Sequence, residues 1–286
     1  MREHAVTHTD RQKHQNPRGA TRLERALAPG RALIPYLTAF DPTPEAFLEA
    51  AAGAAEGGAR ALEIGIPCSD PVADGPVIQR AHHRALASGG SVEGTLSLLE
   101  RLRTETDLPV VLFTYANPVL AFGLDRFLGR ARDAGADGLL LLDCPPQEEP
   151  AWFDEIRRGG LDPVVLLSPN TTAERAARIA SHGGGFLYVV AREGVTGTHG
   201  GAGSDLAARV GAARALSALP VAVGFGVKDH ADVEVLWSLC EAAVVGSAFV
   251  RHLENAGAGD PRRAAQQFIR QLAGSPPPRA GKEQIP

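Results

Sequence analysis

A glutamate inside a short apolar run is the first residue of this sequence whose position suggests chemistry. Glu63 interrupts the run at 61–65, in which the other side chains are apolar or absent. Burying a carboxylate costs free energy unless the group is paired or protonated, and burial raises its pKa toward the range of a general acid. Two interpretations stay open. Glu63 is an acid–base residue, or it is a core glutamate paired with an arginine or with backbone amides.

The loop after this run carries two aspartates. Asp70 stands in a Ser-Asp-Pro turn, where an aspartate side chain ordinarily caps backbone amides. Asp74 precedes Gly75 and Pro76, which is also compatible with a simple turn. The pairing of Asp74 with Glu63 across this loop indicates function, because two carboxyl groups in different environments can divide the acid and base roles. We therefore expect Asp74 to act with Glu63, and Asp70 to have mainly a structural role in the loop.

Small residues follow three later apolar runs. Gly197, Gly226 and the pair Gly246-Ser247 each come after such a run. Glycine lets backbone N–H groups approach an anion, and a helix N-terminus adds partial positive charge. The three loops together predict a phosphate site, and the alternative is three tight turns without a ligand. Apolar lining for the rest of a substrate is available from Tyr36, Ile78, Phe113, Leu140 and Phe225.

These residues need a scaffold that brings the ends of several strands together. Eight apolar runs predict strands buried on both faces of a parallel sheet, at 33–38, 61–65, 109–114, 138–142, 163–168, 186–190, 220–224 and 243–246. Helical patterns lie at 44–56, 92–103, 124–134, 147–157, 172–181, 206–216, 231–239 and 261–272. Repeated βα units predict a single-domain α/β fold, a TIM (β/α)8 barrel with function at the C-terminal strand ends. An open doubly wound sheet is the alternative, disfavoured because no Gly-x-Gly-x-x-Gly follows the first strand.

Composition limits the class of protein. The chain has 286 residues, 44% hydrophobic and 22% charged, which is typical of a globular protein. Its ends predict disordered tails at 1–20 and 274–286 around a barrel domain at 21–273. A formal net charge of −4 argues against nucleic acid as the main partner, and no apolar stretch predicts a membrane span. Three cysteines and no visible secretory signal favour a cytoplasmic protein.

The sequence also disfavours two kinds of reaction chemistry. No His-x-His pair or Glu/His cluster stands at a predicted strand end, so we expect no metal. No lysine lies within a predicted strand, and Lys228 follows one at a position suited to solvent or phosphate contact. A Schiff-base mechanism is therefore disfavoured. These exclusions favour a phosphorylated substrate handled by carboxyl groups.

Glu63 and Asp74 belong to one long motif. Residues 62–79 read LEIGIPCSDPVADGPVIQ, which closely resembles the signature of the tryptophan synthase alpha chain family. Shorter motifs resemble the family in the same order: YANP at 115–118, GVTG at 194–197, GFG at 224–226 and VGSA at 245–248. The resemblance covers roughly residues 21–255.

The resemblance implies a TIM-barrel lyase of tryptophan biosynthesis. Such an enzyme cleaves indole-3-glycerol phosphate to indole and D-glyceraldehyde 3-phosphate. By resemblance, Glu63 is the general acid/base at the indole carbon that loses the side chain. Asp74 stabilises the ring N–H as positive charge develops, and Tyr188 is an active-site tyrosine. Contacts with substrate or its phosphate are implied at Tyr115, Thr196, Gly197, Gly226, Gly246 and Ser247.

The resemblance also implies a partner. The family's beta chain carries pyridoxal phosphate and receives indole through a channel, so we expect an alpha2-beta2 tetramer and no cofactor in this chain. Two other functions stay open. One is a stand-alone indole-3-glycerol-phosphate lyase of secondary metabolism. The other is a non-catalytic barrel that binds sugar phosphate and regulates a partner enzyme, which the presence of both Glu63 and Asp74 disfavours.

Some positions depart from the family pattern. Phe40 stands where glycine is usual, and Ala191 replaces a common serine. Cys68 stands where phenylalanine is usual, and Tyr36 where phenylalanine is frequent. These departures concern loop packing, substrate fit and partner docking more than the type of reaction.

The glycine-rich segment at 192–203 is expected to act as a lid. It follows the sixth predicted strand and contains few apolar residues, so it should be mobile without substrate. Thr196 is expected to donate a hydrogen bond to Asp70 when the lid closes. The alternative is a surface loop without a gating role.

Overall fold

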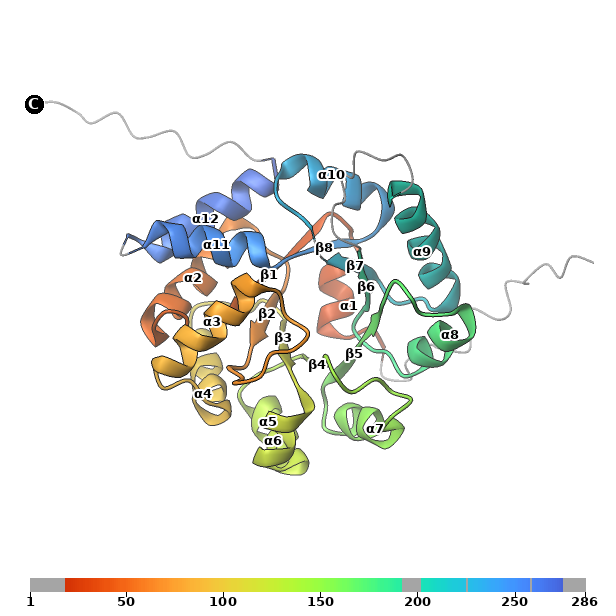
Figure 1. Cartoon of the computed structure of the whole chain (residues 1–286), viewed down its shortest axis with the longest axis horizontal. Helices are drawn as coiled ribbons and strands as arrows, with labels where there is room; N and C mark the ends of the chain where they lie inside the picture. Colours follow the sequence, from red (N-terminus) through yellow and green to blue (C-terminus); the bar gives the residue numbers. More distant parts are fainter. Residues whose placement is uncertain (1–18, 192–201, 225, 258, 275–286) are drawn as a thin grey trace, which may run out of the picture.

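Eight parallel strands form a closed barrel with helices around its outside (Figure 1). The computed structural model describes residues 19–191, 202–224, 226–257 and 259–274, so most of both predicted tails lies outside the described residues. The strands are β1 (Ala32–Thr38), β2 (Leu62–Gly65), β3 (Val110–Thr114), β4 (Gly138–Leu141), β5 (Asp162–Leu167), β6 (Leu187–Val190), β7 (Val221–Gly224) and β8 (Ala242–Val245). Every predicted strand is confirmed to within about one residue at each end.

Pairing of the first strand with the last closes the sheet. Ala32 lies opposite Ala242 across β1 and β8, and Tyr36 lies opposite Glu63 across β1 and β2. Each strand also pairs in parallel with its neighbour in sequence. Such closure defines a barrel, so the predicted TIM barrel is confirmed and the open doubly wound sheet is wrong.

Helices connect the strands and cover the barrel. Those in the described residues are α1 (Arg22–Leu27), α2 (Pro44–Gly57), α3 (Pro76–Ala87), α4 (Val92–Leu102), α5 (Ala116–Phe122), α6 (Leu124–Asp133), α7 (Pro150–Arg158), α8 (Ala173–Ser181), α9 (Ala202–Leu216), α10 (His230–Leu239), α11 (Ser247–Ala256) and α12 (Pro261–Leu272). Each predicted helix is present. None of the helices in the described ranges is long and apolar enough to cross a membrane.

Four helices were not predicted, namely α1, α3, α5 and α11. α1 and α5 have only 6 and 7 residues. α3 begins at Pro76 and buries mostly small side chains, Ala81 and Ala85 among them, together with His82. α11 begins directly after β8, with no intervening loop to mark its start. A search for large apolar residues at helical spacing therefore passes over these elements.

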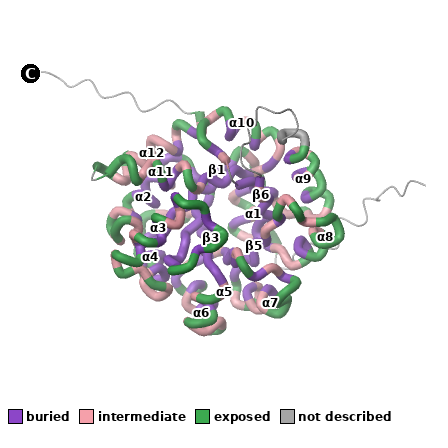
Figure 2. The backbone as a smooth tube through the Cα atoms, viewed as in Figure 1, coloured by how far each residue is buried: buried purple, intermediate pink, exposed green. Residues whose placement is uncertain are grey.

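Side chains alternate between the inside of the barrel and the layer beneath the helices. On β2, Leu62 and Ile64 belong to the core beneath the helices. Glu63 lies in register between Tyr36 and Val111, which belong to the inner cluster of buried side chains. The period of two along a strand thus directs the glutamate into the barrel. Figure 2 shows buried strands at the centre and exposed residues on the surrounding helices.

Helix α1 closes one end of the barrel. Leu23 and Leu27 are fully buried and belong to the inner cluster, and α1 lies across the opening in Figure 1. The helix begins with a capping box between Thr21 and Glu24. The segments that follow the strands lie at the other end, where a substrate can enter.

Candidate active site

A cavity of about 420 Å³ opens at the C-terminal ends of the strands. Its walls come from five strands, the loops after β2 and β7, and helices α3 and α11. The predicted site residues that line it are Tyr36, Glu63, Asp74, Ile78, Phe113, Tyr188, Gly226, Gly246 and Ser247. The fold thus brings the two candidate carboxyl groups and two of the candidate phosphate loops to one space.

Glu63 is buried without a partner for one of its oxygens. The residue is 1% exposed, and burial raises the pKa of its carboxyl group to about 8. Within the described residues, Oε1 has no hydrogen-bond partner. The pairing with arginine or backbone amides that the sequence left open is not observed there. A pKa of about 8 leaves roughly ten protonated groups for each ionised one at pH 7, so Glu63 presents a protonated acid to the cavity.

Asp74 is held by a tyrosine from a neighbouring strand end. Tyr115, directly after β3, donates a hydrogen bond from Oη to Asp74 Oδ2 at 2.7 Å. The same hydroxyl accepts from the N–H of Ala73 at 3.1 Å. Burial and the bond to Asp74 raise the pKa of Tyr115, so its hydroxyl stays a donor. Tyr115 supports Asp74 and is not among the described residues that line the cavity.

Two buried tyrosines extend into the space beside glycines. A Cβ on Gly224 would lie 2.0 Å from Tyr188 Oη, and a Cβ on Gly65 would lie 2.1 Å from Tyr36 Oη. Glycine is required at both positions because any side chain would displace a tyrosine ring. Burial raises the pKa of both tyrosines, so both hydroxyls are neutral at pH 7.

Another part of the wall suits an anion. Gly246 and Ser247 form the N-terminal end of α11, and Gly226, with φ of 86°, follows β7. A Cβ on Gly246 would meet its nearest neighbour at 3.5 Å, which is ordinary van der Waals contact. Backbone N–H groups and the helix dipole favour negative charge there. Lys228 also lines the cavity, in keeping with its predicted contact with solvent or phosphate.

Two further residues beside the site were missed because their helices were missed. Arg251, on α11, lines the cavity. His82, on α3, is 1% exposed, and its Nε2 lies 3.4 Å from Asp74 Oδ2. Residues four apart share one helix face. His82 follows Ile78 and Arg251 follows Ser247 at that spacing, so the helices would have revealed both residues.

The remaining predicted site residues lie elsewhere or outside the described ranges. Leu140 is fully buried in the inner cluster and is not among the described residues that line the cavity. Asp70 is exposed on the loop after β2. Thr196, Gly197 and Phe225 lie outside the described residues, as does the expected bond from Thr196 to Asp70. In the described ranges, no three His, Cys, Asp or Glu side chains gather where they could hold a metal ion.

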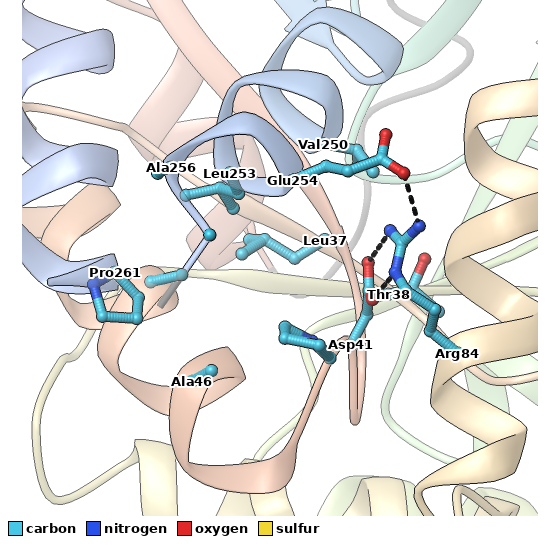
Figure 3. Close-up of a pocket in the computed structure, with 13 residues that line it drawn as sticks. Leu37, Thr38, Asp41, Ala46, Arg84, Val250, Leu253, Glu254, Ala256 and Pro261 are labelled. Carbon is cyan, nitrogen blue, oxygen red and sulfur yellow. Dashed lines mark hydrogen bonds and ion pairs between the residues drawn. The ribbon is translucent and has the colours of Figure 1, made fainter. Parts of the chain in front are cut away.

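A second cavity, of about 210 Å³, is shown in Figure 3. Arg84 donates to the Asp41 carboxylate from Nε at 2.6 Å and from Nη2 at 2.8 Å. Its Nη1 donates to Glu254 at 2.8 Å. The charged groups of this cavity thus satisfy one another, and most of the remaining wall is apolar. Among the described residues of its wall, the one cation is already paired, so the larger of the two cavities is the candidate active site.

The fold and the site together define a class of protein. Buried and hydrogen-bonded carboxyl groups lie at the C-terminal strand ends of a closed barrel, where TIM-barrel enzymes carry their active sites. The chain is therefore a TIM-barrel enzyme, and its candidate active site carries two side-chain carboxyl groups.

Comparisons with known proteins identify the family. The family model described as "Tryptophan synthase alpha chain" matches residues 24–274. The tryptophan synthase alpha chain of Solibacter usitatus is 43% identical over 243 residues, which are 85% of this chain and 91% of that protein. Subunit alpha from Legionella pneumophila has a TM-score of 0.80 at 34% identity, over 90% of this chain and 98% of that one. A structure of Mycobacterium tuberculosis tryptophan synthase also has a TM-score of 0.80 at 34% identity, over 89% of this chain and 98% of that one. The chain belongs to the tryptophan synthase alpha chain family and is a lyase of tryptophan biosynthesis.

We expect Glu63 to make folding stability depend on pH. The unfolded chain ionises this group near its ordinary pKa of 4.5, whereas the native state holds the proton up to about pH 8. The native state therefore binds more protons between those values, and stability falls as the pH rises through them. The free energy of unfolding of wild type minus that of Glu63→Gln should decrease from about pH 5 to about pH 8 and then level off.

Urea titrations of both proteins across this range measure the difference, in which other titrating groups largely cancel. A difference that does not change with pH would contradict the desolvation of Glu63.

Proposed function

We propose that this chain cleaves indole-3-glycerol phosphate to indole and D-glyceraldehyde 3-phosphate in the cavity at the C-terminal strand ends. The observation that carries the proposal is Glu63, whose buried carboxyl group has a pKa of about 8 and keeps its proton at neutral pH. A protonated acid in a partly aromatic pocket can deliver a proton to an electron-rich ring carbon.

During the cleavage Glu63 gives up one proton and takes up another. It donates the first proton to the indole ring carbon that bears the side chain, which leaves the ring positively charged at nitrogen and able to accept electrons. The carbon–carbon bond to the side chain then breaks, and its electron pair restores neutral indole. The hydroxyl group beside the broken bond loses its proton as the aldehyde forms. The ionised Glu63 takes up this proton and returns to its starting state.

Asp74 stabilises the charge on the ring nitrogen. An ionised carboxylate that accepts the ring N–H binds most strongly when the ring is cationic, so it lowers the barrier to protonation. The hydrogen bond from Tyr115 holds the carboxylate in place. Tyr188 lies close enough to Glu63 that the glutamate charge adds to burial in raising the tyrosine pKa. Its hydroxyl can stabilise the ionised Glu63.

The rest of the cavity binds the two ends of the substrate. We assign the phosphate to the backbone N–H groups of Gly246 and Ser247 at the start of α11, with Gly226 beside them. Lys228 and Arg251 in the same wall add positive charge. The indole ring contacts Tyr36, Ile78 and Phe113.

A tryptophan synthase beta chain is the proposed partner, in an alpha2-beta2 tetramer. Two large apolar side chains, Val72 at 69% and Leu120 at 54%, are exposed on segments that follow neighbouring strands β2 and β3. Both side chains would be buried by a partner chain that docks at this end of the barrel. The pyridoxal phosphate belongs to that beta chain. Three buried, unpaired cysteines support a reducing, cytoplasmic setting.

Replacing Glu63 by glutamine should abolish cleavage and spare binding. The amide cannot deliver the proton, so the rate of indole release should fall about 10²–10⁴-fold. Affinity for glycerol 3-phosphate, measured by calorimetry, should stay within about twofold, because Glu63 is assigned to the ring carbon and not to the phosphate.

The matched control is Glu174→Gln, at a side chain on α8 that is 82% exposed. It should leave cleavage unchanged. Both variants are assayed with and without an added beta chain, which should not rescue Glu63→Gln. Near-normal indole release by Glu63→Gln would remove Glu63 from the mechanism.

Replacing Gly246 by valine should weaken phosphate binding. A single Cβ would lie 3.5 Å from Ile78 Cδ1 and 3.9 Å from Tyr36 Cβ, so Gly246→Ala fits. The branched valine adds two methyl groups at the start of α11 and blocks the approach of a phosphate. The dissociation constant for glycerol 3-phosphate should rise at least about tenfold in Gly246→Val and at most about threefold in Gly246→Ala. Equal affinity in all three proteins would place the phosphate elsewhere.

A further inference from the structure

A buried histidine lies against Asp74, and the proposed reaction does not use it. His82 is 1% exposed on α3, beneath the loop that carries Asp74. Its Nε2 lies 3.4 Å from Asp74 Oδ2 and 3.5 Å from Tyr36 Oη. A polar ring fully enclosed beside a reactive carboxylate needs defined hydrogen-bond partners, because an unpaired buried polar group costs free energy.

The backbone fixes where the proton of this ring resides. The N–H of Cys68 donates to His82 Nδ1 at 3.1 Å. Nδ1 must therefore be the unprotonated nitrogen, and the neutral ring carries its proton on Nε2. A doubly protonated ring would direct an N–H at the Cys68 N–H, so this backbone bond also favours the neutral form. The Nε2–H consequently faces Asp74 and Tyr36.

Charge decides between the two acceptors. The Tyr36 hydroxyl already has Thr38 Oγ1 at 3.1 Å as a partner. Both distances from Nε2 are long for a neutral hydrogen bond. A carboxylate attracts a donor more strongly than a neutral hydroxyl does. Nε2 lies in hydrogen-bonding geometry with the Tyr36 hydroxyl and at ion-pair distance from Asp74 Oδ2, and charge favours the carboxylate as its acceptor.

The two oxygens of Asp74 have different surroundings. Oδ2 receives the Tyr115 hydroxyl at 2.7 Å and faces His82 Nε2. No hydrogen bond from the described part of the chain reaches Oδ1. The protein thus occupies one oxygen with its own donors and leaves the other for a donor on the substrate.

We propose that His82 is a positioning residue that holds Asp74 Oδ2 together with Tyr115, so that Oδ1 is presented to the N–H of the substrate ring. The inference rests on the proposed function, in which Asp74 accepts that N–H. His82 acts through Asp74 and touches neither the phosphate nor the carbon that is protonated.

The first test compares two amide substitutions at this position. His82→Asn keeps an acceptor near the Nδ1 position for the Cys68 N–H but removes the donor toward Asp74. His82→Gln extends its amide N–H toward the Nε2 position and restores that donor. In assays of indole release, kcat should fall about tenfold or more in His82→Asn and recover at least partly in His82→Gln. The KM and the affinity for glycerol 3-phosphate should stay within about twofold.

A double-mutant cycle shows whether His82 acts through Asp74. In the Asp74→Asn background, His82→Asn should cause no further loss of kcat, because the group it positions is gone. Additive losses, or coupling to Tyr36→Phe instead of Asp74→Asn, would overturn the inference. Unchanged kcat in His82→Asn, with kcat reduced in Asp74→Asn, would also overturn it and leave the proposed function intact. Unchanged kcat in Asp74→Asn would overturn the proposed role of Asp74 itself.

The tautomer of His82 gives a readout that does not depend on activity. Nitrogen-15 NMR of histidine-labelled wild-type protein distinguishes protonated from unprotonated ring nitrogens, and loss of the signal in His82→Asn assigns it. If that variant fails to fold, His82→Gln serves for the assignment. We expect a neutral ring with the proton on Nε2 at neutral pH. A proton on Nδ1, or a cationic ring, would contradict the inference even if the lyase assay fails.

Discussion

The structure depends on keeping one carboxyl group out of water and away from a compensating charge. Raising the pKa of Glu63 from 4.5 to about 8 disfavours its ionised form by about 5 kcal/mol relative to a solvated glutamate. Because the native state keeps the proton, the cost at pH 7 is that of protonating a glutamate of ordinary pKa 4.5, about 3 kcal/mol, against a net domain stability of about 5–15 kcal/mol. Such a group persists only where a large, well-packed core supports it, and it is chemically useful because its proton is available at neutral pH.

Closure of the barrel provides that environment. The alternation along β2 directs Glu63 inward, the register with β1 and β3 places Tyr36 and Val111 beside it, and α1 closes the opposite end. Asp74 has a different environment, on a loop near the open end with the Tyr115 hydroxyl as donor. Two carboxyl groups about one cavity thus acquire different roles from their surroundings, one by desolvation and the other by hydrogen bonding.

Local patterns in the sequence predicted much of this structure, because strand burial follows short-range apolar runs. They also indicated Glu63, since a carboxylate inside such a run is conspicuous. They did not reveal His82 or Arg251. Helix α3 buries mostly small side chains, and α11 begins directly after a strand. The role of Tyr115 depends on a contact with a residue 41 positions earlier, and no local period encodes that contact. Pairing across loops is a property of the closed barrel.

The central claim is that Glu63 is a neutral acid in the native enzyme at neutral pH. Infrared difference spectroscopy of wild type minus Glu63→Gln tests it directly, because the C=O stretch of a protonated carboxyl group is resolved from that of a carboxylate. The account predicts a protonated carboxyl band at pH 7 that converts to a carboxylate band with a midpoint at about pH 8. A carboxylate band at pH 7, with conversion near the ordinary glutamate pKa of 4.5, would contradict it.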